Sequence, residues 1–176
     1  MPKYILLDST AIPDSNGNLC LFAVGDDFVI KREDGKGGQL MNTRMHGSED
    51  ALGAIPCRRL ASQAKARVLI GGLGMGFTLA AALKELQADA EVLVAELLSG
   101  VIEWNHGPLG SKAGFPLKDP RTQVVHQDVA ELLRSEPGGF DAIMLDIDNG
   151  PEGLTQSANS WLYSVTGLQT CARALR

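Results

Sequence analysis

The strongest constraint on the fold of this chain is a glycine loop between a strand-like run and a helix-like run. The apolar run Val68–Ile70 has β-type side chains, and from Phe77 the sequence is rich in Ala, Leu, Lys and Glu, which favour helix. Between them stand four glycines: Gly71, Gly72, Gly74 and Gly76. A second apolar run, Val92–Ala95, ends at Glu96, 20 positions after Gly76. This order predicts a β-loop-α-β unit that holds a nucleoside, with an acid placed for ribose hydroxyls.

The spacing of the glycines narrows the class of ligand. Gly72, Gly74 and Gly76 form a G-x-G-x-G pattern, whereas a dinucleotide fingerprint would place its third glycine at Phe77. No Lys-Ser or Lys-Thr pair follows, which excludes a P-loop. We therefore predict that these three glycines bind a nucleoside cofactor. A tight strand-to-helix turn without a ligand is the alternative.

Glu96 and Asp128 both follow strand-like runs, and an open parallel sheet binds its ligands at such strand ends. Glu96 is predicted to accept hydrogen bonds from the ribose, unless it is only a solvated strand end. Asp128 is predicted to reach the edge of a purine, with Val129 supplying a backbone amide and an apolar wall. Because Asp also caps helices well, a structural role for Asp128 is equally open, and one side chain can do both.

A polar cluster follows the last strand-like run. Asp146, Asp148 and Asn149 stand where the reacting group would lie. Carboxylates there can bind a cationic amine and accept its proton, so Asp146 and Asp148 are the predicted catalytic residues. Their proximity would raise one pKa, which helps a carboxylate act as a base. The alternative is a turn, because Asp-Asn-Gly-Pro is rich in turn-forming residues.

The remaining pattern predicts an N-terminal β layer over residues 1–45. The runs Leu19–Val24 and Phe28–Lys31 flank Gly-Asp-Asp, which predicts a hairpin, and Gln39–Asn42 is a further strand candidate. With the run at Tyr4–Leu7, we expect two or three antiparallel strands. A helix should begin near Ser48 and end near residue 63.

Residues 46–176 should form a Rossmann-like nucleoside-binding domain, because strands and helices alternate from residue 67 onward. The fold class is thus α/β, with a doubly wound, mainly parallel sheet and a small β-rich N-terminal layer. Residues 107–120 look loop-like and the tail from residue 160 helical. The other expected elements are helices at Phe77–Leu86, Val101–Asn105 and Val129–Arg134, and strands at Thr122–His126 and Ala142–Leu145.

Composition excludes several classes of function. A net charge of −5 gives no basic face for nucleic acid, and no apolar run reaches the roughly 20 residues that span a membrane. The N-terminus lacks a signal-peptide pattern, and three widely spaced cysteines make a disulfide framework improbable, so we expect a cytoplasmic protein. The three histidines share no ligand spacing with each other or with the cysteines, so we expect no metal site.

With these acids in order behind the glycine loop, the chain resembles the S-adenosylmethionine-dependent methyltransferase superfamily, and within it the spermidine synthases. V-L-I-G-G-L-G-M-G-F resembles the family's glycine motif, and D-P-R-T-Q-V-V-H-Q-D its segment leading to an adenine-binding Asp. F-D-A-I-M-L-D-I-D-N-G-P resembles the segment with its proton-accepting Asp. The resemblance implies S-adenosylmethionine or its decarboxylated form as cofactor, with Glu96 on ribose, Asp128 on adenine and Asp146 as general base. It also implies a small-molecule acceptor such as an amine, and leaves a homodimer open.

Two positions depart from the spermidine synthase pattern. That family carries an acid inside the glycine motif, where this chain has Met75, and a second acid three residues after the first, where this chain has Asn149. The leading hypothesis is an aminopropyl or methyl transferase. A non-catalytic nucleoside-binding homologue is the alternative, and an NAD-dependent oxidoreductase is disfavoured by Phe77. The family usually continues beyond the last residues of this chain, so we expect its C-terminal strands to be missing.

Overall fold

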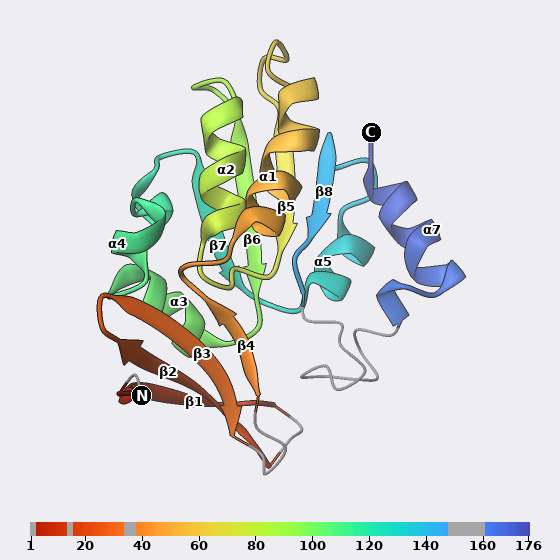
Figure 1. Ribbon diagram of the computed structural model, residues 1–176. Helices are drawn as coiled ribbons and strands as arrows, with labels where there is room; N and C mark the ends of the chain where they lie inside the picture. Colours follow the sequence, from red (N-terminus) through yellow and green to blue (C-terminus); the bar gives the residue numbers. More distant parts are fainter. Residues whose placement is uncertain (1–2, 14–15, 34–37, 148–160) are drawn as a thin grey trace.

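Two sheets of different kinds form the molecule (Figure 1). The computed structural model describes residues 3–13, 16–33, 38–147 and 161–176. An antiparallel sheet at the N-terminus lies beside a parallel sheet that has helices on both faces. This is the predicted Rossmann-like architecture with a β-rich N-terminal layer.

The N-terminal sheet has four strands, one more than the largest number expected. In spatial order they are β1 (Ile5–Ala11), β2 (Asn18–Val24), β3 (Asp27–Glu33) and β4 (Gln39–Asn42). The predicted hairpin is confirmed, since Val24 pairs with Asp27 across a two-residue turn that begins at Gly25. β1 continues past the apolar run, because residues 8–11 pair with β2 although three of the four are polar.

The parallel sheet has the order β7-β6-β5-β8. Its strands are β5 (Arg67–Gly71), β6 (Glu91–Glu96), β7 (Thr122–His126) and β8 (Ala142–Leu145). The chain builds outward from β5 to β7 and then crosses to place β8 on the other side of β5. The strand order therefore reverses between β5 and β8, which is where ligands bind in open α/β sheets.

Helices cover both faces of the parallel sheet because its strands are apolar on both sides. Val68 and Ile70 join a core cluster with the helices that follow β4, β5 and β6, whereas Leu69 joins a second cluster with the helix after β7 and the C-terminal helix. The helical segments are α1 (Gly47–Arg59), α2 (Phe77–Glu85), α3 (Ser99–His106), α4 (Gly110–Ala113), the 3-10 helix η1 (Pro116–Lys118), α5 (Val129–Ser135) and α7 (Val165–Ala174).

Two sequence expectations about helices were wrong. Residues 107–120 are not a plain loop, because α4 and η1 form there around the fully buried side chain of Leu109. Helix α1 ends at Arg59 rather than near residue 63, since the N–H of Leu60 turns to the carbonyl of Cys57 and closes the helix.

The N-terminal sheet packs into the same core as the parallel sheet. Leu21 and Ile30 are fully buried in the cluster that also contains Val68 and Ile70. Helix α1 follows β4 of the N-terminal sheet, and α2 follows β5 of the parallel sheet. Because α1 packs closely on α2, this helix pair connects the two sheets.

The α1–α2 contact depends on Gly53. A Cβ on this buried residue would lie 2.3 Å from the carbonyl oxygen of Thr78 on α2. We expect Gly53→Ala to lower the free energy of unfolding by about 1–3 kcal/mol, because the helices must separate to admit the methyl group. Gly47→Ala is the matched control: Gly47 lies in the same helix with no atom near its Cβ position, and its substitution should stay within about 0.5 kcal/mol. Urea unfolding of both variants checks this, and equal effects would contradict it.

Candidate functional site

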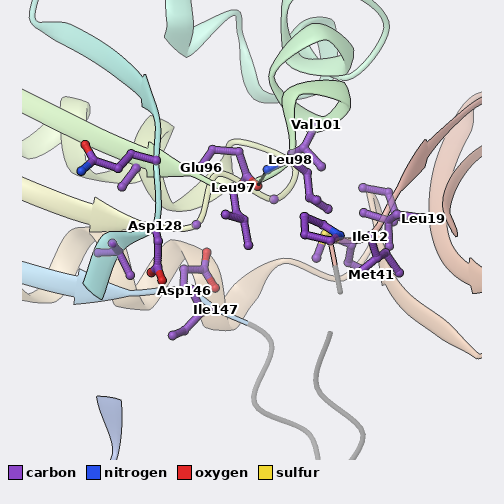
Figure 2. A pocket seen from close by; sticks show the side chains of 17 residues that line it. Ile12, Leu19, Met41, Glu96, Leu97, Leu98, Val101, Asp128, Asp146 and Ile147 are labelled. Atoms are coloured by element: carbon purple, nitrogen blue, oxygen red, sulfur yellow. Dashed lines mark hydrogen bonds between the residues drawn. The ribbon is translucent and has the colours of Figure 1, made fainter. Parts of the chain in front are cut away.

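A cavity lies between the carboxyl ends of the parallel strands and the N-terminal sheet (Figure 2). It encloses about 800 Å³ of space, part of it open solvent. The loops after β5, β6, β7 and β8 all contribute residues to its wall. The cavity therefore lies at the edge of the sheet that was predicted from sequence, where the carboxyl ends of the parallel strands meet.

The glycine loop forms one part of this wall. Gly72 has φ +90°, and a Cβ there would lie 2.2 Å from the carbonyl oxygen of Asp146, so only glycine allows the loop to pass the end of β8. Gly72 and Gly74 line the cavity. Gly76 does not: it precedes α2 as its N-terminal cap and backs onto Asn105. Of the three predicted glycines, two are thus placed for contact with a ligand.

Glu96 ends β6 at the cavity, and only 7% of the residue is exposed to solvent. One carboxylate oxygen accepts a hydrogen bond from the N–H of Leu73 at 2.8 Å, and the other from the N–H of Leu98 at 2.8 Å. Burial raises the pKa of the Glu96 carboxyl, and the backbone N–H groups oppose that shift. The backbone N–H groups of Leu97 and Gly74 also lower the pKa of this carboxyl, so backbone donors of the loops after β5 and β6 surround it.

Asp128 serves the structural role that its sequence position left open. Its side chain caps α5 by accepting a hydrogen bond from the N–H of Ala130 at 2.8 Å. It also lines the cavity beside the buried Val129. The cap fixes the carboxylate at the cavity wall, so the structural and ligand roles are compatible.

Asp146 follows β8 directly and is tied to the glycine loop. Its N–H donates to the carbonyl of Gly71 at 2.7 Å, and its carboxylate accepts a hydrogen bond from the hydroxyl of Thr78 at 2.5 Å. Burial raises the pKa of the Asp146 carboxyl, the Thr78 hydroxyl lowers it, and the negative charge of Glu49 raises it. Asp146 lines the cavity, whereas Asp148 and Asn149 lie outside the described residues.

The carboxylates come together around one space although they are far apart in sequence. Figure 2 shows Asp128 and Asp146 on the same side of the cavity, with Glu96 between them and Leu98. No Lys, Arg or His is among the described residues that line the wall. The cavity therefore has an anionic side suited to a ligand with hydroxyl donors and a positive centre.

Two residues of the site were not predicted from sequence. Thr78 holds the carboxylate of Asp146, and Asn105 donates to the carbonyl of Gly74 at 2.9 Å, which supports the glycine loop from behind. Helix-forming sequence surrounds Thr78, and an Asn inside a short helix carries no signal for such a contact.

Three further residues, Met75, Trp104 and His126, make contacts within the protein. Met75 is buried in the main core cluster and does not line the cavity. Trp104 is also buried, and its indole N–H donates to Asp8 at 2.8 Å, so it packs rather than stacks on a ligand. The His126 ring contacts the carbonyl of Leu97.

The described part of the chain contains neither a candidate membrane helix nor a candidate metal centre. No helix there is both long enough and apolar enough to cross a bilayer. No group of three His, Cys, Asp or Glu side chains is arranged there to hold a metal ion.

Comparison with solved structures identifies the fold. A spermidine synthase in complex with the transition-state analogue AdoDATO superposes with a TM-score of 0.71 at 23% identity, over 97% of this chain and 53% of that one. The Thermotoga maritima spermidine synthase gives 0.71 at 22% identity, over 97% and 54%. A probable spermidine synthase from Corynebacterium glutamicum gives 0.62 at 14% identity, over 100% and 61%.

These likenesses confirm the predicted fold, which is that of the spermidine synthases. The chain spans little more than half the length of these structures. A scan against protein-family models and a search of curated proteins give no match.

The buried Glu96 carboxylate should be needed for stability as well as for binding. In Glu96→Gln, an amide NH₂ replaces one of the two acceptor oxygens and faces the N–H of Leu73 or Leu98. We expect the free energy of unfolding to fall by about 1–3 kcal/mol, because a buried donor loses its partner. Urea unfolding measures this, with Glu103→Gln on the exposed side of α3 as the control. Equal unfolding midpoints for the two variants would contradict the structural role.

The raised pKa of Asp146 predicts a pH-dependent cost of folding. When a carboxyl has a higher pKa folded than unfolded, ionisation favours the unfolded chain, so stability falls as pH rises through the interval between the two values. Asp146→Asn removes this titration and still accepts from Thr78. The variant should therefore gain stability over the parent protein as pH rises from 4 to 7.

Thr78→Val provides the second arm of the same measurement. Loss of the hydroxyl removes the contact that lowers the pKa of Asp146, so the decline of stability should extend to higher pH. Denaturant unfolding at several pH values measures both arms. A difference between Asp146→Asn and the parent that does not change with pH would show that the Asp146 carboxyl is not perturbed.

Proposed function

We propose that this chain is a group transferase that acts on a sulfonium nucleoside, S-adenosylmethionine or its decarboxylated form. It would transfer a methyl or aminopropyl group to a small nucleophile. The observation that carries the proposal is the position of Asp146, a half-buried carboxylate tied to the glycine loop at the wall of a cavity that Glu96 and Asp128 also line.

In the proposed reaction the protein orients the reactants and accepts a proton. A bound sulfonium supplies an activated carbon, whose bond to sulfur breaks as the acceptor attacks, leaving a neutral thioether. Asp146 would orient an amine acceptor and take the proton that the amine loses. Burial supports this role, since a carboxyl with a raised pKa is a stronger base than an exposed one.

The nucleoside roles follow from the order of strands. Glu96, at the end of β6 and in the cavity wall, would accept hydrogen bonds from the ribose. Asp128 would contact the purine edge, with Val129 as apolar wall, while the backbone at Gly72 and Gly74 would approach the ligand closely. Gly76 would act indirectly, by starting α2 behind the loop.

The charge of the cavity bears on the choice of donor. Glu96, Asp128 and Asp146 favour a cationic sulfonium, and the described wall has no basic side chain to pair with an amino-acid carboxylate. This supports the decarboxylated donor, and hence aminopropyl transfer, over methylation. A homodimer stays a prediction from the resemblance, and a cytoplasmic location stays a prediction from the N-terminus and the cysteines.

A non-catalytic nucleoside-binding protein is the second candidate. The observation that favours it is Met75, which is buried in the core at the position where spermidine synthases carry an acid in the glycine motif. Such a protein would bind methylthioadenosine and S-adenosylmethionine analogues without turnover.

Calorimetry and turnover measurements together test the proposal. We expect methylthioadenosine and decarboxylated S-adenosylmethionine to bind, and Asp146→Asn to reduce transfer by about 10²–10⁴-fold with nucleoside affinity retained. Glu96→Ala should weaken nucleoside binding by about 1–3 kcal/mol. Binding without transfer by the parent protein would support the non-catalytic candidate, and failure to bind any of these nucleosides would reject both.

A further inference from the structure

Asn105 contacts the glycine loop from the side away from the cavity. It lies in the last turn of α3, is 1% exposed and is not part of the cavity wall. Its NH₂ group donates to the carbonyl of Gly74 at 2.9 Å and to the carbonyl of Val101, in its own helix, at 2.9 Å. Both donor positions of the amide are therefore used, and one of them holds the loop.

The oxygen of the same side chain lies against Gly76. A Cβ on Gly76, which has φ +83°, would lie 2.8 Å from Oδ1 of Asn105. Among the described residues, none donates a hydrogen bond to this oxygen. An unpaired buried acceptor disfavours folding, so an apolar side chain of similar size would suit the position better if Asn105 only filled space. What distinguishes the amide from such a side chain is its bond to the carbonyl of Gly74.

Asn105 and Glu96 hold opposite groups of the same loop. Glu96 accepts a hydrogen bond from the N–H of Leu73 at 2.8 Å, and Asn105 donates to the carbonyl of the next residue, Gly74. The loop is thus bonded to an acceptor at the end of β6 and to a donor in α3, the helix that follows β6. Its backbone is oriented from both sides.

The bond to Asn105 sets the orientation of the peptide between Gly74 and Met75. Gly74 lines the cavity, whereas its carbonyl is directed to Asn105, which lies behind the wall. Because a trans peptide carries its C=O and N–H on opposite sides, the N–H of Met75 is directed away from Asn105. Gly74 has no side chain to oppose rotation of this peptide, and a rotated carbonyl would add an acceptor to a cavity that three carboxylates already line.

We propose that Asn105 is a positioning residue for the nucleoside, because its NH₂ group keeps the carbonyl of Gly74 out of the cavity. This inference rests on the proposed function, since it assigns a role in binding at the same site. Without the amide, only part of the molecules would have the peptide in the orientation that admits the ligand. The apparent affinity falls in proportion to that part.

Calorimetry with methylthioadenosine on the full chain tests the inference. Asn105→Leu keeps a similar volume and removes both donors, and Asn105→Ala removes them with a smaller side chain that cannot clash. We expect both variants to bind methylthioadenosine about tenfold more weakly than the parent protein, which corresponds to the loss of one hydrogen bond.

Trp104→Phe is the matched control. Trp104 is the neighbour of Asn105 in α3 and is 2% exposed, but its hydrogen bond goes to Asp8 in β1 and not to the glycine loop. The control should unfold at a lower urea concentration than the parent protein and bind methylthioadenosine with the parent affinity. Comparison of the two positions therefore separates positioning of the loop from general stability.

The carbon NMR signal of the Gly74 carbonyl gives a second readout that needs no ligand. A carbonyl carbon is deshielded when its oxygen accepts a hydrogen bond, so the signal should move upfield in Asn105→Leu and stay in place in Trp104→Phe. A signal that does not move in Asn105→Leu would overturn the inference.

The binding outcomes separate this inference from the proposed function. If the parent protein does not bind methylthioadenosine, the proposed function fails. If it binds and the Asn105 variants keep the parent affinity, only the positioning role fails. Equal losses of affinity in the Asn105 and Trp104 variants would also overturn the positioning role, because affinity would then follow stability.

Discussion

The hydrogen bonds of one buried carboxylate determine the geometry of the site. Glu96 accepts from the backbone N–H of Leu73, in the glycine loop after β5, and from that of Leu98, in the chain after β6. It therefore connects the ends of two neighbouring strands from inside the protein. The backbone at Gly72 and Gly74 faces the cavity in a defined position because the loop between them is held there, and removal of either acceptor oxygen would release a buried donor.

The sequence predicted the parallel sheet well and the rest of the fold less completely. Strands β7 and β8 match their predicted bounds, since β7 carries Val124 and Val125 between polar residues and β8 is a short apolar run that stops before Asp146. β1 was underestimated because its second half is polar and is held by pairing with β2. Helix α4 has only four residues, too few for helical periodicity to appear, and it forms because Leu109 and Gly110 are buried by the rest of the chain.

The site residues that were predicted stand at strand ends, and those that were not predicted make contacts that depend on packing between distant segments. Glu96, Asp128 and Asp146 could be placed around one cavity because strand ends of a parallel sheet converge. Thr78 stands 68 positions before Asp146, and its contact arises only when the first turn of α2 meets the residue that follows β8. The residues that the N-terminal sheet contributes to the cavity, such as Leu19 and Met41, were also not predicted, since nothing in the periodicity of the N-terminal strands says which part of the parallel sheet they cover.

The burial of Leu21 and Ile30 against the strands of the other sheet has a consequence for how the protein unfolds. Neither sheet has an apolar core of its own in this region, because the two sheets share one cluster. Loss of the N-terminal strands would expose the inner face of that cluster to water, and loss of the parallel sheet would leave those strands without a surface to cover. The two sheets should therefore melt in one cooperative transition, and a ligand in the cavity between them would raise the midpoint for both.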